Sequence, residues 1–266
     1  MSNRFAKNSA LLLAVLLCAS MAFAQTAAHP EEATTPKTRV PAHAPDLSGI
    51  WLIAAGESSW DPSDERGLKP EQMAMTPWAR EKLKAARPPF GANETFENTN
   101  DPVQKYCDPP GLTRLYSYPW QFTIVQTPGA VYLLYEYFHT WRVVQMNQSH
   151  AKDPDSTWLG DSVGKYEGDT LVIDTVAFND KSWLDQVGHP HSAALHTVER
   201  LRRVDHDTLQ LELTIDDPKA YTKVLTSKRL FKSSSFPLGE TMCSLSEVES
   251  FQQNIINRTN PPQPKK

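Results

Sequence analysis

Histidines and acidic residues gather on one long loop in the second half of the sequence. Its histidines are His189, His191 and His196, and the residues before them include Asn179, Asp180, Trp183 and Asp185. Histidine titrates close to neutral pH, and a neighbouring carboxylate can fix its tautomer and tune its pKa. Long loops between strands also tend to be functional. The loop is therefore a candidate site for acid–base chemistry such as isomerisation, elimination or hydrolysis.

The same histidines allow a second interpretation, a bound metal ion. In His189-Pro190-His191 the two imidazoles can lie on one face of an extended chain, and His196 with Glu199 could complete the ligand set. The spacing matches neither a cupin nor a zinc-protease signature. We therefore predict no cofactor, and keep a divalent metal on His189, His191 and His196 as the alternative.

A second mixture of polar and aromatic residues lies on a predicted strand that continues through position 142. Strand alternation puts Tyr135, Tyr137, His139 and Trp141 on one face and Glu136, Phe138 and Arg142 on the other. A barrel interior with such a lining is typical of a ligand cavity. We expect His139 and Glu136 to join the acid–base residues, and Tyr135, Tyr137, Trp141 and Arg142 to contact the ligand.

Two carboxylates on other predicted strands are candidates for the same interior. Asp174 and Glu199 stand among apolar neighbours, and an inward carboxylate must be paired with a cation. Arg142, Arg200 or Arg203 could supply that cation. Glu199 is a candidate catalytic residue and Asp174 a candidate ligand contact. Structural salt bridges between neighbouring strands are the alternative explanation.

Strands joined by tight turns must position these residues. A Pro-Gly turn separates the β-rich segments 122–126 and 131–137, and further predicted strands cover 162–166, 170–176, 196–204, 208–215 and 221–231. Almost no helix is predicted between them. This pattern predicts an antiparallel meander, and closure into a barrel would remove its exposed edges.

The segment before these strands has a different character. A first strand over 46–53 contains Gly49-Ile50-Trp51, which is similar to the Gly-x-Trp signature of lipocalins. Thr76 as a cap and Pro77 in the first turn predict a short helix to Ala85. We interpret residues 57–110 as a long, partly helical insertion after the first strand.

Several motifs in the second half support a family resemblance. They are Trp158-Leu159-Gly160-Asp161-Ser162-Val163-Gly164, Glu167-Gly168-Asp169-Thr170-Leu171-Val172-Ile173-Asp174-Thr175, Phe178-Asn179-Asp180-Lys181, Trp183-Leu184-Asp185 and Gly188-His189-Pro190-His191-Ser192. With these motifs the chain, from Asp46 to about Cys243, resembles a large family of exported bacterial proteins that has no established reaction. The resemblance implies a lipocalin-like (calycin-type) β-barrel. Lys165-Tyr166 departs from the Arg-Trp pair expected in that family.

The N-terminus predicts export. A short basic start with Arg4 and Lys7 precedes an uncharged apolar run from Ala10 to Ala24, which is typical of a signal peptide cleaved before Gln25. The run is shorter than the ~20 apolar residues that a bilayer span requires. We therefore expect no stable membrane span, and a periplasmic or secreted protein.

The remaining segments divide simply. Residues 25–45 predict a disordered leader, 46–257 a single domain and 258–266 a disordered tail. Acylation of Cys18 would make a lipoprotein instead, but Leu17 stands where a small residue is expected.

Charge and cysteine content narrow the possible partners. Loss of residues 1–24 with Arg4 and Lys7 would lower the net charge from −4 by two, to −6, and no basic patch suggests nucleic acid. The two remaining cysteines, Cys107 and Cys243, predict a disulfide in an oxidising compartment, with two buried free thiols as the alternative.

These patterns together predict an exported lipocalin-like protein that binds a small, mostly apolar or aromatic molecule. The abundance of histidines and carboxylates near the predicted barrel mouth favours a metal-independent isomerase, lyase or hydrolase. A non-catalytic periplasmic carrier and a histidine-rich metal-binding protein are the alternatives. The oligomeric state is open.

Overall fold

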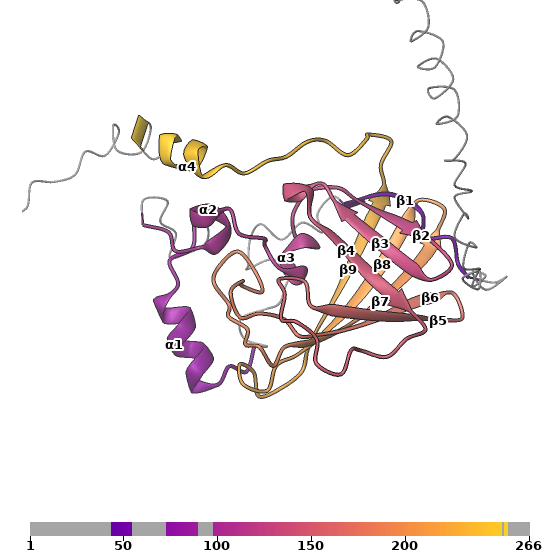
Figure 1. Ribbon diagram of the computed structural model, residues 1–266, viewed down its shortest axis with the longest axis horizontal. Helices are drawn as coiled ribbons and strands as arrows, with labels where there is room; N and C mark the ends of the chain where they lie inside the picture. The colour runs from indigo at the N-terminus through magenta and orange to yellow at the C-terminus, as the bar shows by residue number, and fades with distance from the viewer. Residues whose placement is uncertain (1–43, 55–72, 90–97, 252, 255–266) are drawn as a thin grey trace, which may run out of the picture. The chain divides into compact units, whose positions relative to one another are not determined.

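The fold is a closed β-barrel. The computed structural model describes residues 44–54, 73–89, 98–251 and 253–254 (Figure 1). Over these residues nine strands follow one another around the barrel, and β9 closes it by pairing with β1. The predicted mostly-β barrel is therefore confirmed. The strands are β1 (Gly49–Ile53), β2 (Phe122–Gln126), β3 (Ala130–Tyr135), β4 (Trp141–Met146), β5 (Asp161–Glu167), β6 (Thr170–Val176), β7 (His196–Asp205), β8 (Thr208–Asp216) and β9 (Leu225–Ser233).

One strand pair breaks the expected antiparallel pattern. β4 and β5 are parallel, with Val144 opposite Ser162 and Met146 opposite Gly164. Parallel neighbours need a connection of about a dozen residues or more. The 147–160 segment provides it by returning the chain to the start of β5. The prediction of a purely antiparallel barrel is wrong at this pair.

The barrel interior is filled by the inward residues of each strand. On β2 and β3, Phe122, Ile124, Leu133 and Tyr135 are buried. Trp51, from the Gly-x-Trp motif, is fully buried, and its indole N–H donates to a backbone carbonyl. The alternation of the sequence thus sets which side chains enter the core.

Short helices lie between β1 and β2, between β3 and β4, and after β9. They are α1 (Pro77–Ala85), α2 (Pro102–Tyr106), α3 (Leu112–Leu115), the 3-10 turn η1 (Tyr137–His139) and α4 (Leu245–Phe251). The predicted start of α1 is confirmed, because the Thr76 side chain accepts from the Ala79 N–H. Within the described ranges, no helix has the length and hydropathy to cross a bilayer.

Other predicted segments lie outside the described residues. They are the signal peptide, nearly all of the leader, the tail, and positions 57–72 and 90–97 of the proposed insertion.

The expected continuous strand through positions 135–142 is wrong. β3 ends at Tyr135, and the chain reverses through η1, where Phe138 and His139 have positive φ angles of 55° and 48°. β4 then starts at Trp141. The chain reverses between β3 and β4, so the inward and outward alternation of β3 does not continue into β4. Tyr135 is buried, whereas Trp141 is 63% exposed.

The predicted disulfide is confirmed. Cys107, directly after α2, is bonded to Cys243, and their Cα atoms are 5.5 Å apart. The bond joins the helical region before β2 to the segment that follows β9. Loop-closure entropy makes a crosslink of this span worth about 5 kcal/mol in the chain-entropy model.

Candidate active site

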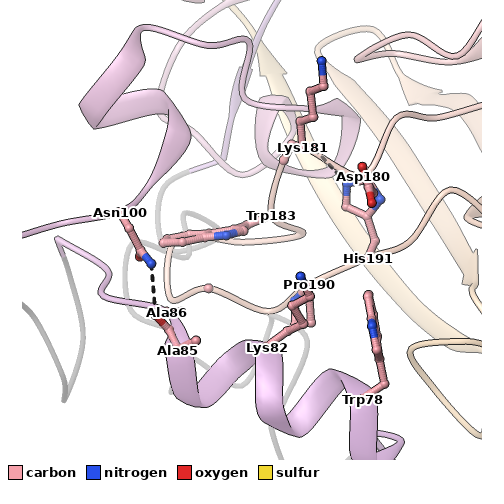
Figure 2. A pocket seen from close by; sticks show the side chains of 12 residues that line it. Trp78, Lys82, Ala85, Ala86, Asn100, Asp180, Lys181, Trp183, Pro190 and His191 are labelled. Atoms are coloured by element: carbon pink, nitrogen blue, oxygen red, sulfur yellow. Dashed lines mark hydrogen bonds between the residues drawn. The ribbon is translucent and has the colours of Figure 1, made fainter.

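A pocket lies between α1 and the loop that connects β6 to β7. Its volume is about 240 Å³. Figure 2 shows side chains that line it. α1 and Asn100 form one side, and the loop forms the other. The lining residues are Trp78, Lys82, Ala85, Ala86, Asn100, Asp180, Lys181, Ser182, Trp183, Gly188, Pro190 and His191.

The loop folds back on itself to bring two of these residues together. Trp183 and Pro190 form an isolated antiparallel bridge, and the Leu184 N–H donates to the His189 carbonyl at 2.8 Å. The residues that flank this bridge, Ser182 and His191, therefore meet across the fold.

Ser182 and His191 are directly hydrogen-bonded. The distance from Ser182 Oγ to His191 Nε2 is 2.8 Å, and His191 Nδ1 lies 3.2 Å from the Ser192 carbonyl oxygen. A carbonyl only accepts, so Nδ1 carries the proton of the neutral ring and Nε2 keeps its lone pair. The hydroxyl of Ser182 then donates to Nε2. This is the arrangement of a nucleophile beside its general base.

Burial keeps His191 in the basic form. The ring lies in the protein interior, and desolvation lowers the pKa of His191 from its ordinary value of 6.5. The Ser192 carbonyl and the charges of Asp217 and Asp180 act in the opposite direction but do not reverse the shift. A neutral imidazole is therefore available at neutral pH.

Asp217 positions the backbone that orients His191. One of its carboxylate oxygens accepts from the Ser192 N–H at 2.5 Å and the other from the Ser192 hydroxyl at 2.8 Å. Tyr221 adds a hydrogen bond of 2.7 Å from its hydroxyl to the Pro190 carbonyl. Because these contacts hold residues 190–192, they also hold the carbonyl that sets the His191 tautomer.

Two glycines permit the close approach of the pocket walls. Gly188 has a φ of +97°, and a Cβ there would collide with the Ala86 methyl of α1. Gly111 has a φ of +82°, and a Cβ there would collide with the Ser182 hydroxyl. Glycine is needed at both positions for its backbone angle and for its lack of a side chain.

The helices α2 and α3 support the same loop. Arg114 of α3 forms a bidentate ion pair with Asp101, with both distances at 2.8 Å, and both side chains are buried. The Arg114 guanidinium lies 6.0 Å from the centre of a Trp183 ring. Thr113 donates to the Leu184 carbonyl at 2.6 Å. α3 is thus fastened to Trp183 and Leu184.

Asp185 and His189 brace the turn of the loop. The His189 ring bonds directly to one oxygen of Asp185, whose other oxygen accepts from the backbone N–H groups of Val187 and His189. Burial alone would raise the pKa of Asp185, but the His189 contact and these N–H donors outweigh it and lower the pKa. Neither side chain lines the pocket.

Three further predicted residues, Arg142, Glu199 and Tyr135, lie inside the barrel. Arg142 of β4 reaches across to Glu199 of β7 with two hydrogen bonds of 2.6 and 2.7 Å, and the Tyr116 hydroxyl donates to the same carboxylate at 2.6 Å. The predicted pairing of Glu199 with an arginine is confirmed, and the partner is Arg142. Burial raises the pKa of the neighbouring Tyr135 to about 12.

Asp174 and His196 lie on the outer face of the barrel. His196 Nε2 is 2.9 Å from Asp174, and His150 bridges Asp174 and Asp161 at 2.8 and 2.7 Å. The expectation that Asp174 faces inward is wrong, because its neighbours Ile173 and Thr175 take the inward positions of β6.

The remaining candidates lie at the reversal between β3 and β4. Glu136 accepts from the backbone N–H groups of Gln121 and Gly239, each at 3.1 Å, and so holds the segment after β9. Tyr137 stacks on Phe138 with ring centres 4.1 Å apart, and His139 is exposed.

The structure therefore distributes the predicted residues over four places instead of one barrel mouth. The pocket receives Asp180, Trp183 and His191, with Asp185 and His189 beside it. Asn179 lies on the same loop, where its side chain accepts from the Lys181 N–H.

The histidines of the metal alternative have three different partners. His189 bonds to Asp185, His191 to Ser182 and His196 to Asp174. In the part of the chain that the structure describes, no group of three or more His, Cys, Asp or Glu residues is arranged to hold a metal ion.

Sequence reasoning missed Ser182 and the α1 residues Trp78 and Lys82. Ser182 stands between the predicted Asp180 and Trp183, so its place on the histidine-bearing loop was the available signal. Trp78 and Lys82 are more than 90 positions away along the chain and carry no such signal.

No family model and no curated protein matches this sequence. Three chains among solved structures match, including one described as "REP1-NXSQ fatty acid transporter". That chain is 14% identical over 72% of the present chain and 98% of its own, with a TM-score of 0.32. A likeness at this level assigns no ligand or activity to the present chain.

Proposed function

We propose that this protein is a hydrolase for a small, largely apolar ester, and that its active site is the pocket between α1 and the β6–β7 loop. The observation that carries the proposal is the Ser182–His191 hydrogen bond of 2.8 Å in the pocket wall. The neutral His191 ring and its fixed tautomer support it.

The chemistry follows the usual order for a serine nucleophile. Ser182 Oγ attacks the ester carbonyl carbon, and His191 Nε2 takes the hydroxyl proton. The C–O bond to the leaving alcohol breaks, and His191 returns the proton to that oxygen. Water then attacks the acyl-enzyme with His191 again as base, which releases the acid and restores the Ser182 hydroxyl. The aromatic faces of Trp78 and Trp183 supply apolar contact area for the substrate.

Covalent labelling tests the nucleophile directly. A fluorophosphonate should add to Ser182 with loss of fluoride, and peptide mass spectrometry should locate the adduct there. Hydrolysis of 4-nitrophenyl butyrate should follow the same residue. Both signals should be lost in Ser182→Ala and retained in the control Ser156→Ala, whose serine is exposed on the β4–β5 connection.

Two results would contradict the proposal. One is labelling at another serine, and the other is turnover that survives in Ser182→Ala. A ligand that copurifies and is never transformed would instead support the periplasmic carrier.

We also propose that the protein is exported and that it belongs to the family of exported proteins that its motifs resemble. The basic and apolar N-terminal pattern and the Cys107–Cys243 disulfide support export. The closed barrel is compatible with the lipocalin-like fold that the resemblance implies. Mass spectrometry of protein from the native host tests the predicted cut before Gln25.

A further inference from the structure

The pocket carries more positive than negative charge. Its lining contains Lys82, Lys181 and a single acidic residue, Asp180. Lys219, on the connection between β8 and β9, approaches the ring of the pocket residue Trp78. The charge of Lys181 is partly balanced by Asp108: burial raises the pKa of that carboxyl, and the nearby Lys181 charge opposes the rise without reversing it. Lys82 and Lys219 therefore hold the cationic charge that matters for a ligand.

The ammonium groups of Lys82 and Lys219 contact an aromatic ring instead of an acid. Lys82 Nζ lies 5.8 Å and Lys219 Nζ 4.9 Å from the centre of the Trp78 ring. Across the described ranges neither ammonium forms a salt bridge, whereas Lys165 is 2.8 Å from Glu167. An indole face attracts a cation without neutralising it. Both charges thus remain available to an anion.

Of these two lysines, Lys82 is the one that lines the pocket itself. Figure 2 shows its side chain extending from α1 toward Pro190, between Trp183 and Trp78, while Lys181 points away from α1. A ligand in the pocket would meet the Lys82 ammonium together with the two indole rings.

We infer that the substrate is a small organic anion with a flat apolar part, and that Lys82 is the residue that selects for its negative charge. This inference rests on the proposed hydrolysis at Ser182. The negative group, a carboxylate or a phosphate, pairs with Lys82, and the apolar part contacts Trp78 and Trp183. Asp180, on the same wall as His191, disfavours a second negative charge near the reacting ester.

A matched pair of substrates tests the charge preference. The 4-nitrophenyl monoester of adipic acid carries a carboxylate, and 4-nitrophenyl pentanoate is its neutral counterpart. kcat/KM should favour the anionic ester by about fivefold, the size expected for one partly exposed ion pair. In Lys82→Gln the preference should disappear because KM for the anionic ester rises while its kcat stays the same. In the wild type the preference should shrink at high salt.

Lys84→Gln is the matched control. Lys84 is exposed on α1, does not line the pocket and carries the same charge. An equal loss of preference in both variants would show a general field effect of the helix and overturn the role of Lys82. Equal kcat/KM values for the two esters in the wild type would overturn the inference itself.

A binding measurement separates failure of this inference from failure of the proposed hydrolysis. In Ser182→Ala, calorimetric titration should give tighter binding of benzoate or phenyl phosphate than of benzamide, and Lys82→Gln should remove the difference. If wild-type protein hydrolyses neither ester but keeps this preference, the reaction is wrong and the charge selection stands. If benzoate and phenyl phosphate bind no better than benzamide, the charge selection is wrong.

Discussion

The barrel interior and the pocket beside α1 both bury ionisable groups, but they use them differently. Inside the barrel, Arg142 and Glu199 pair with each other and with Tyr116 in the space between the strands. In the pocket, Ser182 and His191 meet at a wall that faces open volume. The comparison teaches that reachable space, more than residue type, separates a structural network from a candidate catalytic pair.

The pKa shifts of the buried groups also differ between the barrel interior and the pocket. Burial alone would lower the pKa of Arg142, yet the Glu199 carboxylate raises it far above its ordinary value, so the arginine is a permanent cation. Burial lowers the pKa of His191, whose two ring nitrogens bond to the Ser182 hydroxyl and the Ser192 carbonyl. The barrel network therefore holds fixed charges, and the pocket holds a group that can accept and return a proton.

Removal of one barrel charge should have the largest effect. Glu199→Gln leaves Arg142 buried without its carboxylate, and we expect the free energy of unfolding to fall by about 3–5 kcal/mol. Denaturation in urea measures it. The double variant Arg142→Met with Glu199→Met should recover part of the loss. A decrease below about 1 kcal/mol in the single variant would show that the network is not structural.

Gly111→Ala should impair the pocket without altering either reactive residue. The new methyl group would collide with Ser182 Oγ, and the positive φ of Gly111 adds backbone strain. We expect ester hydrolysis to fall by about tenfold or more, since a misplaced nucleophile loses its alignment. Gly129→Ala, where a Cβ meets nothing within 4 Å, is the control. Unchanged hydrolysis in Gly111→Ala would argue against Ser182 as nucleophile.

The pH dependence of hydrolysis should report the lowered pKa of His191. The neutral ring is the active form, so the rate should hold as pH falls to 6.5 and decline only below that value. Stability should change in the same direction. The unfolded chain gains a proton near pH 6.5 that the folded chain does not, so this histidine disfavours the fold as pH falls. Initial rates at saturating substrate measure the profile, and an acid limb above pH 6.5 would contradict the assignment.

His150 should show the opposite sign with the smallest effect. Partial burial acts to lower its pKa, but the hydrogen bonds to Asp174 and Asp161 outweigh it and raise the pKa. The stabilisation is therefore present below the unfolded pKa near 6.5 and is lost as pH rises through the higher folded value. His150→Gln should cost less than about 1 kcal/mol at acid pH, because the site is partly exposed. Thermal unfolding at acid and alkaline pH should show that difference; an equal cost at both would contradict it.

Local patterns predicted much of the fold. Alternating residues and turn dipeptides placed every strand except β4 within a few positions, and Thr76 with Pro77 placed the start of α1. The errors occurred where a long connection intervened or the chain reversed. The 147–160 segment made β4 and β5 parallel, and η1 interrupted the aromatic run after Tyr135. Neither change leaves a signal in a short sequence window.

The candidate site was only partly predictable. The histidine-bearing loop was identified from composition, and His191, Asp180 and Trp183 do line the pocket. Glu199 and His196 carry the same carboxylate and imidazole groups as Asp180 and His191, yet Glu199 lies in the barrel interior and His196 on the outer face. Burial and partner choice depend on strand register and closure, which residue types alone do not specify.

The sequence by itself determined the strand-rich barrel, the Cys107–Cys243 pairing and the loop on which the reactive histidine lies. Strand alternation and turns are local patterns, and two remaining cysteines leave only one possible pair within the chain. Only the tertiary structure decided that Ser182 meets His191 and that α1 supplies Trp78 and Lys82 to the same pocket. The physical reason is that long-range packing, here permitted by Gly111 and Gly188, sets which distant side chains share a space.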